Sequence, residues 1–311
     1  MTMPSGPEKP RQTLSTCLRL GLKGFCMGAA DVVPGVSGGT MAFILGIYEE
    51  LIAAIRSMDS AFLGLFLRGR LREALHRVSW PFLACVGGGI LCAVFSLARV
   101  LSWLLHNEPV LIWSFFFGLI VASVFTVSRR IKAWRPRVPA GIVAGAAGTY
   151  ALVGLVPVST PDAPWFLFLS GAVAICAMIL PGISGAFILV LLGKYLYILE
   201  AVNHRDVFTL ALVGGGAVVG LLSVSRLLGW LFRTYHDATI AFLTGLMLGS
   251  LRKVWPWKAS PGHAAAGGEG SAAAMPANVF PNEWTLETTA ALALALAGFL
   301  LVLWISRRVE G

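Results

Sequence analysis

A short polar stretch at positions 34–40, PGVSGGT, interrupts an apolar region and contains residue types that bind anions. Ser37 and Thr40 supply hydroxyl groups that can cap a helix or donate to an anion. Gly38 and Gly39 allow a ligand to approach the backbone N–H groups closely. Where such a turn begins a helix, its unpaired N–H groups favour phosphate or carboxylate. The stretch therefore predicts an anion-binding site.

The same stretch occurs a second time in the later half of the chain. Positions 181–187 read PGISGAF, so that Ser184 and Gly185 correspond to Ser37 and Gly38. A single PG-S-G sequence is most simply a tight turn with a capping serine. Two copies favour one site built from both turns, with the phosphate-binding groups on Ser37, Gly38, Gly39, Thr40, Ser184 and Gly185.

Each copy begins with a proline–glycine pair that is expected to break an apolar helix. These pairs are Pro34 with Gly35 and Pro181 with Gly182. Proline removes a backbone donor and cannot continue a helix. Irregular backbone within a bilayer is tolerated only where protein or a water-filled cavity surrounds it. Each pair therefore predicts a hairpin broken inside the membrane, next to a cavity.

A second pair of segments supports a duplication of the whole chain. Nine of nineteen positions are identical between 86–104 and 213–231 when the two are aligned without gaps. The matched positions include Arg99 and Arg226, which lie in otherwise apolar helices. A charged side chain at depth normally faces a cavity or a partner, which would add both arginines to the phosphate site. Alternatively, their long side chains reach the membrane surface, and the two readings carry equal weight.

The other charged residues near the two turns suggest further roles. Asp31 precedes the first turn and Glu49 follows it, so either could carry a coupling proton. The alternative for Asp31 is an ion pair with an arginine or a hydrogen bond to the turn. Arg252 and Lys253 are predicted to lie on the outer side, where they would meet an anionic substrate. Lys194, within an apolar run, would do likewise or extend outward.

The composition indicates a membrane protein. Hydrophobic residues make up 57% of the chain, charged residues 13%, and the mean hydropathy is +0.79. Several apolar runs approach the ~20 residues that span a bilayer. The net charge of +9 is explained by the basic residues that orient a membrane protein, which gather in its cytoplasmic segments. No nucleic-acid partner is therefore expected. The histidines show no metal spacing, the five cysteines are interpreted as small core residues rather than disulfides, and neither a metal nor a cofactor is assigned.

The expected fold is an all-α polytopic membrane protein with two inverted-topology repeats. Each repeat contains a broken, re-entrant hairpin followed by three transmembrane helices, and an odd number of crossings inverts the second repeat. Segments predicted to be cytoplasmic hold 17 of the 24 lysines and arginines, which places both termini in the cytoplasm. The predicted divisions are a tail at 1–17, repeat 1 at 18–158, repeat 2 at 159–306 with an outer loop at 252–284, and a tail at 307–311.

The first repeat contains an insert at 56–78 that mixes apolar residues with arginines. It predicts a basic amphipathic helix on the inner membrane surface, where Arg68, Arg70 and Arg72 would contact anionic lipids. The outer loop is rich in alanine, glycine and proline, so we expect no chemistry there.

Three motifs resemble those of the bacterial polyprenyl-phosphate, or undecaprenyl-phosphate, transporter family. They read GAADVVPGVSGGTMAFILGIYEELI, PGISGAFILVLLGKY and TGLMLGSLRKVWPW, and the resemblance covers roughly residues 18–306. It implies a translocase that returns the lipid carrier of cell-wall precursors across the bacterial cytoplasmic membrane. The second motif departs from the first, because Ala186 and Phe187 replace Gly39 and Thr40. The residue patterns alone indicate only a transporter with anion sites.

Two other functions remain open at this point. Membrane undecaprenyl-pyrophosphate phosphatases also contain re-entrant helices, but they have a PG-x-S-R-S motif. Here Ser37 and Ser184 are followed by glycine, and no ExxxE acid cluster accompanies them. Hydrolysis needs an acid or base beside the nucleophile, and only Asp31 is available. The remaining alternative is a small-anion transporter or channel, which would conduct ions without a lipid.

Overall fold

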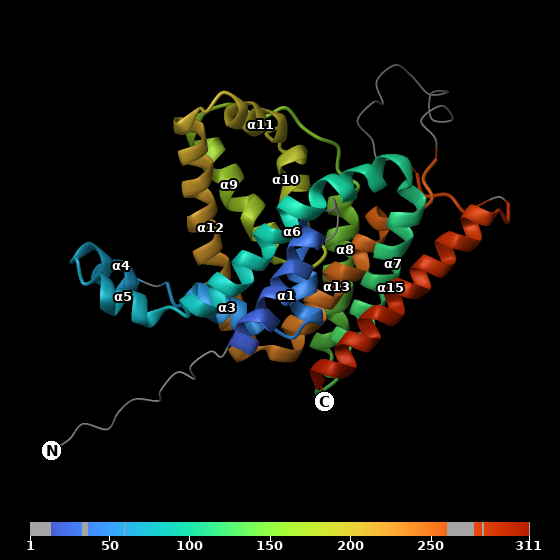
Figure 1. The fold of residues 1–311 in the computed structure, drawn as a ribbon, viewed down its shortest axis with the longest axis horizontal. Helices are drawn as coiled ribbons and strands as arrows, with labels where there is room; N and C mark the ends of the chain where they lie inside the picture. The colour runs from blue at the N-terminus through green and yellow to red at the C-terminus, as the bar shows by residue number, and fades with distance from the viewer. Residues whose placement is uncertain (1–13, 33–36, 59, 260–276, 282, 311) are drawn as a thin grey trace.

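The computed structural model describes residues 14–32, 37–58, 60–259, 277–281 and 283–310 (Figure 1). Within these ranges every regular element is a helix, apart from an isolated bridge between Lys258 and Asn278. This confirms the predicted all-helical class. The helices are α1 (Leu14–Val32), α2 (Gly38–Ile44), α3 (Tyr48–Arg56), α4 (Ser60–Leu67), α5 (Leu71–Arg77), α6 (Trp80–Asn107), α7 (Pro109–Ser128), α8 (Arg137–Val153), α9 (Pro164–Ile179), α10 (Gly185–Leu191), α11 (Tyr195–Asn203), α12 (Val207–Thr234), α13 (His236–Val254) and α15 (Leu286–Glu310).

Two pairs of short helices follow the two PG-S-G sequences. The chain bends by 118° between α2 and α3 and by 106° between α10 and α11. Gly46 and Gly193, which correspond in the two copies, occupy these bends with φ of +69° and +63°. Side chains disfavour this left-handed backbone, so glycine permits both bends. The two bends therefore reproduce at the backbone level the duplication found in the sequence.

The long helices pack in matched pairs. Helix α1 lies against α6, and α9 lies against α12. A Cβ atom on Gly24 of α1 would collide with the carbonyl oxygen of Val86, and one on Gly171 of α9 with that of Val213. The repeats align Gly24 with Gly171 and Val86 with Val213, so the two packing contacts are equivalent. Helices without Cβ atoms at these points can approach closely, as membrane helices commonly do.

The remaining helices connect the two halves of the chain. Helix α7 packs on α15 and on α13, and α8 packs on α13. Thus the main partners of these helices come from the other half of the sequence, and α7 also contacts α2 and α6 of its own half. In Figure 1, α9 and α12 stand at the left and α7, α8, α13 and α15 at the right, with α1 and α6 between them.

Several helices are suited to crossing a bilayer. Four in the described ranges are long and apolar enough, and the number rises to six if each bent pair is one span. Helices α8 and α9 are apolar but shorter. The chain is therefore a multi-pass membrane protein. The apolar segments in the four long helices are Trp80–Leu97, Pro109–Ser128, Val207–Thr234 and Leu286–Arg308.

The basic insert forms two short helices instead of one amphipathic helix. Helices α4 and α5 are separated at Gly69, whose φ of +73° ends the first of them. Figure 1 shows the pair extending to the left of the helical body. Arg68, Arg70 and Arg72 are exposed, and Arg70 pairs with Glu73 of the same helix pair at 2.6 Å.

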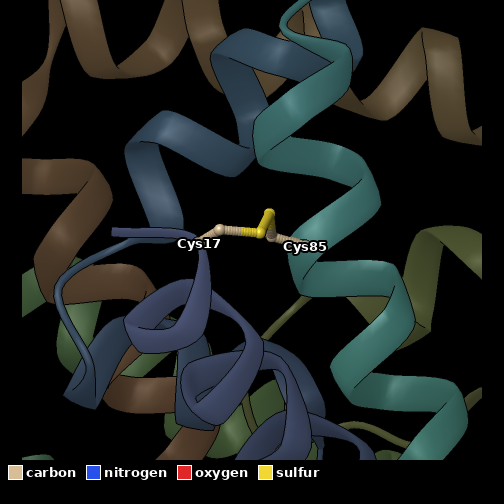
Figure 2. Close-up of a disulfide and its surroundings, with 2 residues drawn as sticks. All are labelled: Cys17 and Cys85. Atoms are coloured by element: carbon tan, nitrogen blue, oxygen red, sulfur yellow. A yellow bond between two sulfur atoms is a disulfide. The ribbon is translucent and has the colours of Figure 1, made fainter. Parts of the chain in front are cut away.

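The expectation that the cysteines form no disulfide is wrong. Cys17 of α1 and Cys85 of α6 are joined, with their Cα atoms 5.6 Å apart (Figure 2). This separation is within the usual range for disulfides. The sequence offers no paired spacing because the two cysteines are 68 positions apart, and only the packing of α1 on α6 brings them together. Cys26, Cys92 and Cys176 are free thiols.

Lys194 neither extends outward nor faces an open site. Its side chain is 2% exposed and donates to the carbonyl oxygen of Thr160 at 2.8 Å. It also forms an ion pair with Asp162. Thr160 in turn donates to the carbonyl of Leu192, and in the first half Lys23 donates to the matching carbonyl of Leu45 at 2.9 Å. Each helix end after a PG-S-G turn is thus held by a polar side chain.

Replacing Lys194 with methionine is expected to destabilise the second hairpin by about 1–3 kcal/mol, because the Thr160 carbonyl loses its donor. The apparent Tm in detergent, followed by tryptophan fluorescence, should fall by a few degrees. The exposed Lys132→Met provides the control and should leave the Tm unchanged. Equal Tm values for the two variants would show that Lys194 does not fasten the hairpin.

Candidate functional site

Ser37 of the first PG-S-G sequence is buried and forms several hydrogen bonds. Ser37 has an extended backbone and its Oγ accepts a hydrogen bond from the N–H of Gly39 at 3.1 Å, which caps α2. The same Oγ lies 3.0 Å from the carbonyl oxygen of Met178 and 3.3 Å from that of Leu180, and its hydroxyl donates to this pair. Ser37 therefore joins the start of α2 to the end of α9.

Two further side chains hold the first turn against the second. The Oγ1 of Thr40 accepts from the N–H of Gly182 at 3.0 Å, and the hydroxyl of Tyr48 donates to the carbonyl of Ile179 at 3.3 Å. Ser37, Thr40 and Tyr48 are all fully buried. The structure therefore brings the start of α2 against the second break, and Pro34 and Gly35 of the first break lie outside the described residues.

Asp31 binds directly to the first turn. Its Oδ1 accepts from the N–H of Gly38 at 2.7 Å, a short charge-assisted hydrogen bond. A Cβ on Gly38 would come within 2.5 Å of Oδ2, so only glycine admits the carboxylate. A Cβ on Gly39 would meet the carbonyl of Ile179 across the junction. Of the alternatives for Asp31, the hydrogen bond to the turn is the one observed, and it places an anionic group on the N–H.

The second turn lacks these internal partners. Gly182 has φ of +86°, and Pro181 precedes it at the junction. Ser184 begins α10 with an extended backbone, but its side chain makes no capping hydrogen bond. Met178 occupies the position that corresponds to Asp31. Among the described residues, therefore, no carboxylate occupies the N–H of Gly185 as Asp31 occupies that of Gly38.

Arg99 and Arg226 do not reach the turns. Both are exposed, on outward faces of α6 and α12 that also carry the exposed Trp103 and Trp230. Neither forms an ion pair within the described ranges. In this conformation the arrangement favours arginines that extend along an apolar surface toward the membrane interface.

Glu49 lies at the start of α3, and its partner is not the one that Asp31 binds. Its Oε1 is 3.6 Å from Nε2 of His236, at the start of α13. Because Glu49 is exposed, this pair links two helix ends rather than the two turns.

The end of α13 forms a separate basic pocket. Arg252 donates to the carbonyl of Tyr150 at 2.9 Å and its guanidinium covers the Tyr150 ring. Lys258 donates to the Arg252 carbonyl at 3.0 Å and to Asn278 at 2.6 Å. These groups line a pocket of about 610 Å³, and beside them Lys253 lies 3.4 Å from the ring centre of Phe187 in α10.

Sequence reasoning missed Tyr48 and Lys258. The sequence could have indicated Tyr48, because Tyr195 occupies the same position in the second copy of the motif. Lys258 had none, since its role depends on the bridge to Asn278 across the loop. Burial, and next the charge of Arg252, lowers the pKa of Lys258 to about 8.

Lys258 should therefore make anion binding at this pocket depend on pH. It is charged below about pH 8 and neutral above, whereas Arg252 stays charged. We expect affinity for a polyprenyl phosphate analogue to fall by about fivefold between pH 7 and pH 9, where the phosphate, with its second pKa near 6, remains a dianion. In Lys258→Gln the affinity should vary less between about pH 7 and pH 9 than in the wild-type protein. A pH dependence as steep as that of the wild type would show that Lys258 does not bind the anion.

The apolar helices and the two interlocked broken hairpins define a multi-pass membrane protein of the transporter type. Residues 27–267 match the family described as VCA0040-like, undecaprenyl phosphate translocase-like. The chain belongs to this family. A Vibrio cholerae protein named polyprenyl-phosphate transporter is 42% identical over 295 residues, covering 93% of this chain and 96% of the relative. A Staphylococcus aureus protein of the same name is 33% identical over 258 residues, covering 76% and 85%. No solved structure matched the chain significantly.

Proposed function

We propose that this protein translocates undecaprenyl or a related polyprenyl phosphate across the bacterial cytoplasmic membrane and so recycles the lipid carrier for cell-wall synthesis. The names of its relatives support the substrate. The observation that supports the site is the meeting of the two turns through Ser37, Thr40 and Gly182. The phosphate binds between these turns, and the protein acts as a transporter rather than an enzyme.

Asp31 suggests how the phosphate enters. Its carboxylate already occupies the N–H of Gly38, so the first turn holds an internal anion. A phosphate that takes this position must displace the carboxylate. Protonation of Asp31 removes its charge and weakens the bond that competes with the phosphate. Asp31 thereby couples proton uptake to phosphate binding, while Glu49, paired with His236, plays no part at the turn.

The open groups of the second turn supply the other half of the site. The hydroxyl of Ser184 and the N–H of Gly185 are free of the carboxylate that blocks the first turn. With the two repeats inverted, one turn is reached from each side of the membrane. Rocking of the repeats against each other then exposes the phosphate alternately to the two sides.

The basic pocket at the end of α13 serves as the outer entrance. Arg252, Lys253 and Lys258 attract the phosphate at the outer surface, where positive residues are otherwise scarce in the predicted topology. Lys253 contacts Phe187 of α10, so the entrance adjoins the second hairpin. The exposed arginines of α4 and α5 bind anionic lipids on the inner surface, with both termini on that side.

The proposed function is tested in liposomes that contain the purified protein and undecaprenyl phosphate in one leaflet. Headgroup accessibility is followed over time, and phosphate release from undecaprenyl pyrophosphate is assayed in the same samples. We expect translocation without phosphate release. Released phosphate without translocation would move the protein to the phosphatase class. Ion flux in liposomes without polyprenyl phosphate would indicate a small-anion channel.

A further inference from the structure

An apolar groove lies in the angle between α12 and α13. These helices diverge from Tyr235, the single residue between them. The groove has a volume of about 480 Å³, within the range of roughly 300–1,000 Å³ typical of ligand sites. Its floor is formed by the buried Val224, Leu228 and Leu243, and its walls by the exposed Leu227 and Phe242. A ligand that enters sideways from the bilayer would meet almost only hydrocarbon.

One end of the groove carries a positive charge. Arg137, the first residue of α8, lies there with its guanidinium 5.9 Å from the ring centre of Tyr235. No carboxylate among the described residues forms an ion pair with Arg137. The preceding segment is fixed because Asp237 accepts hydrogen bonds from the N–H groups of Lys132 and Ala133 at 3.2 and 3.0 Å. The cation is therefore held near the open vertex and is available to an anionic headgroup.

The other end of the groove reaches the junction of the two turns. Leu180 lines it, and the carbonyl of Leu180 lies 3.3 Å from the hydroxyl of Ser37. From Tyr235 back to Val224 the helical rise is about 16 Å. A single apolar track thus leads from a surface cation to the proposed phosphate site.

The corresponding place in the first half of the chain has the opposite charge. Glu108 stands between α6 and α7 where Tyr235 stands between α12 and α13, in the same register that aligns the two halves. A carboxylate at that vertex repels a phosphate. The wall residue Leu227 corresponds to Val100, and both side chains are 53% exposed. The two places therefore expose equivalent apolar side chains but differ in charge. Comparing them can distinguish a site specific for a phosphate lipid from a surface that any lipid covers.

We propose that this groove is an inner lipid site for polyprenyl phosphate, with the phosphate on Arg137 and the first isoprene units between α12 and α13. The inference rests on the proposed function and adds a place for the chain. The volume accommodates only the part of the lipid next to the headgroup, and the rest of the chain stays in the bilayer. The groove opens at the start of α13, opposite the outer entrance at its end, so a phosphate moving inward passes from the turns near Leu180 along the groove to Arg137.

Alkylation of an engineered cysteine tests the inner lipid site. Leu227→Cys protein in nanodiscs is treated with a maleimide, with and without geranylgeranyl phosphate, and labelling of that peptide is followed by mass spectrometry. At a probe concentration of about ten times its Kd, labelling should slow by roughly tenfold. Val100→Cys is the matched control and should label at an unchanged rate. Equal protection at both positions, or none at Leu227→Cys, would overturn the inner lipid site.

Further ligands test whether protection requires both the phosphate and the isoprenoid chain, and whether an ordinary anionic lipid also protects. Phosphatidylglycerol, geranylgeraniol and inorganic phosphate are each expected to protect Leu227→Cys by less than about twofold at the same concentration. Protection by phosphatidylglycerol equal to that by geranylgeranyl phosphate would make the groove an ordinary lipid contact. Adding Arg137→Gln should remove most of the protection, whereas Arg135→Gln, an exposed arginine of the same segment, should not.

The same assay separates this inference from the proposed function. Adding Ser37→Ala to Leu227→Cys should leave the protection intact, because the groove binds the lipid independently of the turns. Protection together with full translocation by Ser37→Ala protein would retain the inner lipid site and reject the site between the turns. No protection, together with translocation lost in Ser37→Ala protein, would reject only the inner lipid site.

Discussion

Replacing Ser37 with alanine and Thr40 with valine in one protein is expected to slow translocation of polyprenyl phosphate by about 10- to 100-fold. The two changes remove the hydroxyl shared by the Met178 and Leu180 carbonyls and the acceptor of the Gly182 N–H. Each buried group left without a partner costs about 1–3 kcal/mol. Part of this cost falls on the arrangement that binds phosphate, because the turns no longer hold each other in register. Transport in liposomes measures the effect.

Two buried side chains provide matched controls for this double variant. Ser123 and Thr244 are as buried as Ser37 and Thr40, but their hydroxyls bond only to carbonyls of their own helices. The pair Ser123→Ala and Thr244→Val should keep nearly full transport. An equal loss in both double variants would show that transport follows general stability, and it would contradict a special role for the junction.

Asp31→Asn is expected to bind polyprenyl phosphate about tenfold more tightly at neutral pH and to transport it more slowly. The neutral side chain still accepts from the Gly38 N–H, but a bond without charge is roughly half as strong. The bound phosphate then meets a weaker competitor, which raises affinity and hinders release. In the wild-type protein affinity should rise as the pH falls, because protonation neutralises the carboxylate. In Asp31→Asn only the pH dependence that arises from titration of the phosphate itself, whose second pKa is near 6, should remain.

Glu49→Gln serves as the control for this prediction. Glu49 is exposed and lies against His236, so its neutralisation should leave both the affinity and its pH dependence at the wild-type values. Lipid affinity is measured in nanodiscs between about pH 5.5 and pH 7, below the range in which Lys258 loses its charge. Identical pH profiles for the wild type and Asp31→Asn would remove Asp31 from the coupling.

The parts of the fold that depend on local sequence could be predicted. Proline and glycine determine backbone breaks directly, so the hairpins at Gly182 and at Gly193 follow from residue type. Exact repetition of Ser37 as Ser184 indicated that the two turns form one site, and the structure places the first turn against the second break. Apolar length indicated the membrane class before any packing was known.

Features that depend on helix packing could not be predicted. The face on which Arg99 lies is set by the rotation of α6, and a charge within an apolar helix does not reveal that rotation. The disulfide of Cys17 with Cys85 requires the contact of α1 with α6. Lys194 is satisfied by Asp162 and Thr160 from a neighbouring loop, which no spacing indicates. The inversion of the repeats and the sidedness of the termini remain predictions.

A nuclear magnetic resonance distance between the phosphorus of bound polyprenyl phosphate and chosen backbone nitrogens tests the central claim most directly. Protein labelled with ¹³C at serine carbonyls and ¹⁵N at glycine shows only four doubly labelled amides, those of Gly6, Gly38, Gly171 and Gly185. A phosphate between the turns should lie within about 4 Å of the Gly38 and Gly185 nitrogens, the distance of a direct N–H to phosphate contact. Gly171 of α9, which packs on Val213 of α12, should show no contact with the phosphorus. Phosphorus far from both Gly38 and Gly185, with lipid bound and transported, would contradict the site between the two turns.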